Sequence, residues 1–138
     1  MAVDLAGIGE TTTKNRDKLL GDWKAYYLNY LLGDSFVGTR TEQAIACCYW
    51  ASNYETKTPR KVHLVGVGAA TIPALHAAAL EPELITTTTL RQLAPSWSTV
   101  VNSALPASQL DNAVHGALRI YDTTDLIGLL DKRVTIEK

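Results

Sequence analysis

The chain has 138 residues, of which 46% are hydrophobic and 20% are charged, and its formal net charge is −1. This length favours a single domain over residues 1–138, and a charge so near zero gives no electrostatic reason to expect binding to nucleic acid or to an anionic membrane. Residues 1–10 lack the basic and apolar regions of a signal peptide, and the longest apolar runs fall far short of a membrane span.

The first part of the chain predicts a strand, a polar loop and a short helix. Residues 2–5 are an apolar run followed by glycine, which is typical of a strand, and the loop covers residues 11–20. Asp22 can cap a short helix, and Gly33 can end it. A strand so close to the first residue suggests that its partner strands are missing upstream.

The middle of the chain predicts a long helix, a buried strand and a second helix. Asp34 or Ser35 begins a helix that reaches about residue 54, because apolar side chains recur in it at spacings of three, four and seven. Residues 62–67 form a nearly continuous apolar run, as expected for a strand buried on both faces. The alanine-rich residues 70–80 follow as a helix.

The last part of the chain continues this alternation. Residues 84–90 contain four consecutive threonines, which suit a strand, and residues 94–109 are typical of a crossover loop. Asp122 begins a capping box whose helix reaches Leu130, and residues 133–136 form a final strand. Strands that alternate with helices predict an α/β fold, here a three-layer αβα sandwich with a mainly parallel sheet of about four strands.

The glycine turn after residues 62–67 is the most informative motif. Gly66, Gly68 and Ala70 occupy the pattern G-x-S-x-G of the nucleophile elbow, a sharp strand-to-helix turn that presents the serine of serine hydrolases. Gly68 stands in the serine position and has no side chain that could attack a substrate. The turn therefore fits the fold of such an enzyme and argues against its chemistry.

Other segments share the order of a known family. Residues 3–10 are similar to a D-L-R-G-x-G-E-S turn, and residues 31–40 to an L-L-G-x-S-x-V-G-x-R helix entry. Residues 62–70 match the elbow strand, and residues 116–126 match the stretch before a later strand. By these motifs and their order, the chain resembles the α/β-hydrolase superfamily, most closely its acetyl xylan esterase-like and dipeptidyl-peptidase-like members.

The resemblance implies a partial α/β-hydrolase domain. In the family, three strands and one oxyanion-hole donor precede the part matched here, and the catalytic acid and histidine follow the strand that ends near Lys138. It therefore implies no acid or base position in this chain and no nucleophile at Gly68. The N–H group of Ala69, at a helix start, could still hold an anion. We predict a degenerate hydrolase-like domain without esterase activity and without a cofactor, with a role in binding or assembly.

Two other functions remain open. The chain could be a fragment or subunit of an esterase- or peptidase-type serine hydrolase that another chain completes. Alternatively, residues 66–71 nearly match the dinucleotide fingerprint G-x-G-x-x-G, with Thr71 in place of the third glycine. The acidic residue expected about 20 positions later is absent, and Arg91 lies there, where it could meet a 2′-phosphate. The ligand-binding candidates are Gly68, Ala69 and Arg91.

The histidines and cysteines predict no further site. We expect His63 to be packed in its strand, His76 to be packed or half exposed, and His115 to be free in a loop, so that a metal site is not expected. Cys47 and Cys48 are adjacent, which is unfavourable geometry for a disulfide. Reduced thiols fit a cytoplasmic protein.

The predicted sheet has a strand edge or slot that a partner could cover. The family has a strand between those matched by residues 2–5 and 62–67, and this chain lacks it. The two strands must then pair directly or leave a slot, and an open strand edge tends to pair with another chain. We predict a homo-oligomer, or a partner chain, that covers the sheet edge.

Overall fold

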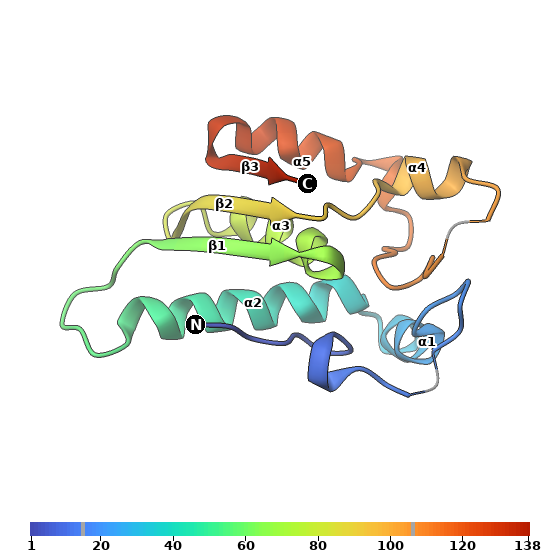
Figure 1. The fold of residues 1–138 in the computed structure, drawn as a ribbon, viewed down its shortest axis with the longest axis horizontal. Helices are drawn as coiled ribbons and strands as arrows, with labels where there is room; N and C mark the ends of the chain where they lie inside the picture. The colour runs from blue at the N-terminus through green and yellow to red at the C-terminus, as the bar shows by residue number, and fades with distance from the viewer. Residues whose placement is uncertain (15, 106) are drawn as a thin grey trace.

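A computed structural model describes residues 1–14, 16–105 and 107–138. It contains helices and a three-stranded parallel sheet, which confirms the predicted α/β class (Figure 1). The strands are β1 (Val62–Val67), β2 (Ile85–Arg91) and β3 (Val134–Glu137). They lie in the sheet in the order β1-β2-β3, which is also their order in the chain.

Three of the α-helices form one layer against the sheet. The α-helices of the described residues are α1 (Trp23–Leu31), α2 (Phe36–Asn53), α3 (Thr71–Leu80), α4 (Trp97–Asn102) and α5 (Thr123–Leu130). Helix α3 packs against β1 and β2, and α2 and α5 pack on either side of α3 (Figure 1). A strand–helix–strand crossover is almost always right-handed. Because the strands follow one another in one direction, α3 and α5 lie on the same face of the sheet.

The helices begin where local capping chemistry predicts. The Asp22 carboxylate accepts a hydrogen bond from the N–H of Ala25 (3.2 Å) at the start of α1, and the Ser35 hydroxyl accepts one from the N–H of Gly38 (2.8 Å) at the start of α2. The side chain of Asp122 caps α5 as part of a capping box. These bonds satisfy N–H groups that have no partner within the helix.

Residues 2–5 form no strand, and that prediction is wrong. The segment has no strand partner, and the sheet of the described residues has three strands rather than about four. Side chains of α2 satisfy the adjacent backbone instead. The N–H of Ala6 donates to Oε1 of Gln43 (2.9 Å), and Nε of Arg40 donates to the carbonyl of Ala6 (2.8 Å).

Residues 94–109 are not only a loop, because they contain the short helix α4. The Ser96 hydroxyl accepts a hydrogen bond from the N–H of Thr99 (3.2 Å) at its start. Trp97 is buried in a small cluster with Val37, Ile72 and Ala117. Burial of the tryptophan anchors α4 beside the carboxyl ends of the strands.

The two faces of the sheet have different environments. The inner face, toward the helices, includes Leu64, Gly66 and Leu90, and Leu90 is fully buried. On the outer face, Val65 and Val67 are 42% and 48% exposed. The expectation that β1 is buried on both faces is therefore wrong. The described residues place α2, α3 and α5 on one face only and leave the other open, rather than covering both.

The core depends on close contact between β1 and α3. A Cβ atom at Gly66 would lie 2.8 Å from the Cβ of Ala74 and 3.1 Å from the backbone of Thr71. Small side chains on α3 let the helix approach the strand, and Leu75 completes the buried cluster. In the described part of the chain, no helix combines the length and the apolar character needed to cross a membrane.

Candidate functional site

The turn after β1 has the backbone of a sharp strand-to-helix connection. Strand β1 ends at Val67, the 3₁₀ helix η2 (Gly68–Ala70) follows, and α3 begins at Thr71. Gly68 has a φ of +57°, in the left-handed region that side-chain-bearing residues rarely adopt. A Cβ atom at this position would meet no atom within 4 Å. A side chain here would therefore stand in open space at the carboxyl end of the strand.

Thr71, in the third-glycine position of the dinucleotide pattern, stabilises this turn from within. Its hydroxyl donates to the carbonyl of Gly68 (2.6 Å) and accepts from the N–H of Ala94 (3.1 Å). The Asn112 amide, oriented to satisfy both its oxygen and its nitrogen, donates to the carbonyl of Ala69 (3.1 Å). The first bond closes the turn itself, and the bonds from Ala94 and Asn112 connect it to the segments after β2 and before α5.

Arg91 lies at the carboxyl end of β2, as the sequence predicts, but it is already paired. Its Nε donates to Oε2 of Glu137 on the neighbouring strand β3 (2.6 Å). Both side chains are about half exposed, so the pair contributes little to stability. A phosphate group bound by the remaining N–H groups of Arg91 would lie beside the Glu137 carboxylate, and the repulsion between the two anions disfavours such binding.

His63 is not packed in the core, and that prediction is wrong. Alternate residues of a strand point to opposite faces, which places this imidazole on the exposed outer face of the sheet. Its Nδ1 lies 2.7 Å from the hydroxyl oxygen of Thr87, and its Nε2 lies 3.2 Å from that of Thr89. The ring therefore bridges two threonines of β2 and does not approach the Gly68 turn.

The other two histidines are held by separate parts of the molecule. Nδ1 of His76 lies 2.8 Å from the carbonyl oxygen of Ile72, and its Nε2 lies 2.9 Å from the hydroxyl of Tyr121. Burial lowers the pKa of His76, and the contact with Ile72 offsets part of that change. His115 is exposed and contacts the ring of Tyr30 edge-on, with centroids 5.1 Å apart.

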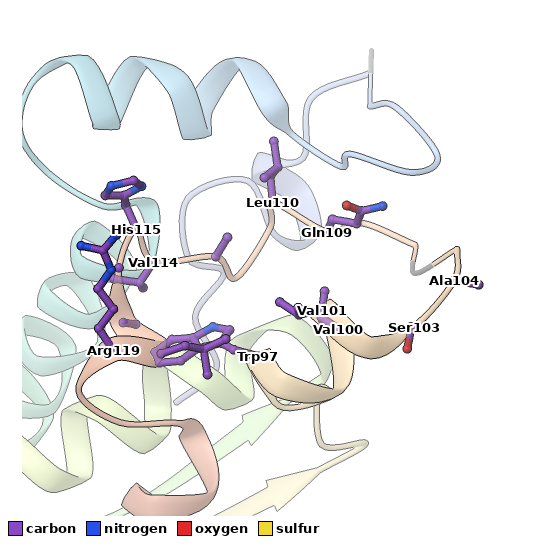
Figure 2. A pocket seen from close by; sticks show the side chains of 14 residues that line it. Trp97, Val100, Val101, Ser103, Ala104, Gln109, Leu110, Val114, His115 and Arg119 are labelled. Carbon is purple, nitrogen blue, oxygen red and sulfur yellow. The ribbon is translucent and has the colours of Figure 1, made fainter.

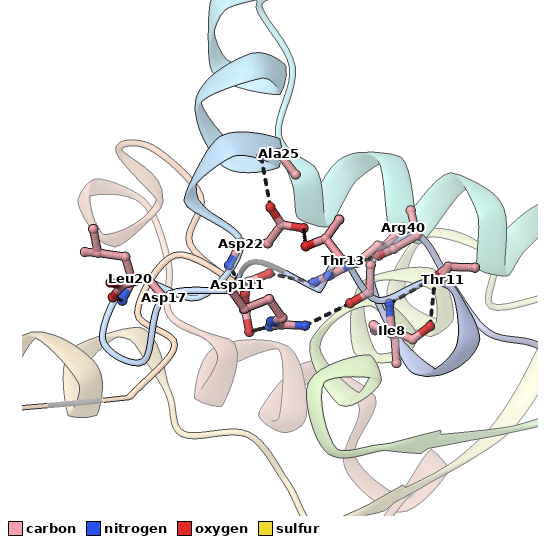
Figure 3. Close-up of polar contacts among 12 residues, drawn as sticks. Ile8, Thr11, Thr13, Asp17, Leu20, Asp22, Ala25, Arg40 and Asp111 are labelled. Atoms are coloured by element: carbon pink, nitrogen blue, oxygen red, sulfur yellow. Dashed lines mark hydrogen bonds and ion pairs between the residues drawn. The ribbon is translucent and has the colours of Figure 1, made fainter.

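A buried arginine that the sequence did not single out ties three segments together (Figure 3). Arg40 of α2 is fully buried. Its Nη1 donates a hydrogen bond to the carbonyl of Asp111 (2.6 Å), and its Nε donates one to the carbonyl of Ala6 (2.8 Å). Its guanidinium carbon lies 3.9 Å from the ring centroid of Phe36. Burial lowers the pKa of Arg40 to about 10, so the group stays charged at neutral pH.

The carboxylate of Asp111 extends this network. It accepts a hydrogen bond from the N–H of Asp22 (2.9 Å) and forms an ion pair with Arg16, whose Nη1 donates to the carbonyl of Gly7 (3.0 Å). The two arginines thus hold the N-terminal segment against the chain near residue 111 (Figure 3). Residues 40 and 111 are 71 positions apart, so no local pattern reveals the pair.

A cavity of about 620 Å³ lies beside this network. Helix α4 and the segment of residues 109–119 form its walls, and Trp97, His115 and Arg119 are among the side chains that line it. The sequence does not predict this cavity, because its pattern over residues 94–109 is typical of a loop and one wall of the cavity is the helix α4 within that segment. The signal for α4 was present in Ser96, a helix cap followed by a tryptophan and two valines at helical spacing.

The described residues contain no group of three or more His, Cys, Asp or Glu side chains placed to hold a metal ion. Comparisons with protein-family models, curated proteins and solved structures found no match to this chain.

Proposed function

We propose that this chain is an α/β-hydrolase-like domain that lacks the catalytic nucleophile, has no esterase activity of its own, and acts in assembly through the open face of its sheet. The observation that carries the proposal is Gly68. It has a left-handed φ of +57° in a strand-to-helix turn, with open space where a nucleophilic side chain would stand.

The order of elements around Gly68 supports a hydrolase-like turn. A parallel strand leads into a tight turn and then a helix, which is the setting of the nucleophile elbow. The strained backbone of an elbow is tolerated because it presents a side chain to substrate. At Gly68 the conformation is present and the side chain is absent, which supports a domain with the scaffold of a hydrolase but not its first catalytic group.

The histidines also support inactivity. Acyl transfer by a serine needs a base within hydrogen-bond reach of the nucleophile and a third group that orients the base. His76 is bonded to Ile72 and Tyr121, and His63 to two threonines of the outer face. Neither ring is bonded to the Gly68 turn.

The outer face of the sheet supports the assembly role. Val65 and Val67 expose apolar surface there, and unpaired strand edges and apolar patches are typical of surfaces that a partner covers. The nearby charges Arg91 and Glu137 neutralise each other. Such a face can meet a copy of itself without like-charge repulsion, so we propose a homo-oligomer in which a second copy covers it.

Nucleotide binding through residues 66–71 has less support. The Thr71 hydroxyl is used within the turn, and Arg91 is paired with Glu137. Cys47 and Cys48 are free thiols, which fits the predicted cytoplasmic location without testing it. Thermal denaturation with and without NAD or NADP checks the nucleotide alternative, and we expect no shift with either.

The catalytic part of the proposal is tested with a fluorophosphonate probe and with p-nitrophenyl acetate. We expect no labelled serine and no hydrolysis above background. The matched variant Gly68→Ser should also remain inactive, because a base and an acid are still missing. Stoichiometric labelling of a serine in the unmodified chain would overturn the proposal and favour a subunit of a serine hydrolase.

A further inference from the structure

The cavity beside α4 has the size of a small-molecule site. Its volume of about 620 Å³ falls within the roughly 300–1,000 Å³ of typical ligand pockets. Figure 2 shows Val100 and Val101 of α4 on one side, Leu110 across from them, and Trp97 between α4 and the residues near 115. The walls are thus largely apolar and come from two separate segments of the chain.

The tryptophan in this cavity is held in a fixed orientation. Nε1 of Trp97 donates to the carbonyl of Asn112 (2.6 Å), and its ring contacts that of Tyr121 edge-on, with centroids 5.3 Å apart. The side chain therefore loses little freedom when a ligand packs against it. Val101, by contrast, is 71% exposed, and a ligand in the cavity would remove part of this apolar surface from water.

The ionisable side chains that line the cavity are basic. Arg119 and His115 line one end of it, where Figure 2 shows the guanidinium and the imidazole near each other. None of the residues lining the cavity is Asp or Glu. Among the described residues, no carboxylate forms a salt bridge with Arg119. Asp34 lines a separate hollow together with His115, and its carboxylate accepts a hydrogen bond from the N–H of Ser35 (2.6 Å).

We propose that this cavity binds a small organic carboxylate with a planar apolar body. The carboxylate pairs with Arg119, whose planar fork of N–H donors matches two carboxylate oxygens. The apolar body lies between α4, which contributes Trp97 and the two valines, and Leu110 on the opposite wall, and His115 adds a ring N–H donor at the charged end. The site is separate from the Gly68 turn and does not depend on the proposed hydrolase-like function.

Calorimetric titration with naphthalene-2-carboxylate tests the proposal, with 2-naphthalenemethanol as the neutral ligand of similar shape. We expect the carboxylate to bind about tenfold more tightly than the alcohol, since a charge-assisted hydrogen bond is lost with the alcohol. Arg119→Gln should weaken carboxylate binding by about tenfold and leave alcohol binding unchanged. Lys132→Gln removes one exposed positive charge outside the cavity and should have no effect.

A charge introduced into the wall of the cavity tests the same site without changing Arg119. Val101→Glu places a negative charge in the wall at an exposed position, so the fold should persist, as circular dichroism can verify, while carboxylate binding is lost. The proposal is overturned if the folded wild-type chain does not bind the carboxylate, if both ligands bind equally well, or if Arg119→Gln binds the carboxylate as the wild type does.

Discussion

The inner face of the sheet is filled by the molecule's own helices, whereas the outer face is left to solvent. On the inner face, Gly66 and Leu90 contact α3 and its neighbours, with no room for an added methyl group at Gly66. On the outer face, Val65 and His63 of the same strand are exposed. The side chains that stabilise the strands by burial therefore lie on one face, and the other face is exposed to solvent.

Truncation of one side chain on each face is expected to give the largest contrast. Leu90→Ala removes a fully buried side chain from the inner face and should lower the free energy of unfolding by about 3 kcal/mol, through lost burial and a residual cavity. Val65→Ala, on the neighbouring strand but facing outward, should lower it by about 0.5 kcal/mol or less. Urea denaturation of the two variants measures the difference, and equal losses would show that the outer face is also packed.

Substitution of the inward-facing Gly66 should also lower the free energy of unfolding more than substitution of Gly68, which faces open space. Gly66→Ala forces a Cβ to 2.8 Å from that of Ala74, which should cost about 2–3 kcal/mol of unfolding free energy. Gly68→Ala meets no neighbouring atom and should cost about 1 kcal/mol, from the left-handed backbone alone. Denaturation midpoints rank the variants, and a larger loss for Gly68→Ala would contradict the assigned contact between β1 and α3.

Acidification should weaken the native state through His76, with a smaller effect. Burial lowers the pKa of His76 below its ordinary value of 6.5, so the unfolded chain binds the proton first. The stabilising contribution of the neutral imidazole is complete above pH 6.5 and is lost as the pH falls through the lower folded value. His76→Gln should flatten this part of the stability profile, measured by thermal denaturation between pH 7 and pH 5, and an unchanged slope would contradict it.

The element boundaries were predictable because their signals are local. Asp22, Ser35 and Asp122 cap helices through hydrogen bonds to residues one to three positions away, and such short patterns are visible in a sequence. The strand predicted at residues 2–5 failed for the opposite reason. The backbone next to this segment, at Ala6, bonds to Gln43, which is 37 positions away in the sequence. An apolar run of a few residues does not reveal so distant a contact.

The open face and the candidate sites were beyond what periodicity can predict. A continuous apolar strand has the same sequence whether its outer face is covered by helices of its own chain or left open, so β1 was expected to be buried on both faces. The turn at Gly68 was predicted from its glycines. The Arg40–Asp111 contact and the cavity around Arg119 depend on tertiary packing of segments far apart in the sequence.

We propose that a second copy of the chain covers the outer face of the sheet. Sedimentation velocity of the wild type and of the double variant Val65→Lys, Val67→Lys tests it most directly. The control is Leu129→Lys, which replaces another exposed apolar residue, on α5. We expect the wild type and the control to be oligomeric and the double variant to be monomeric. A monomeric wild type, or a double variant that still associates, would contradict the claim.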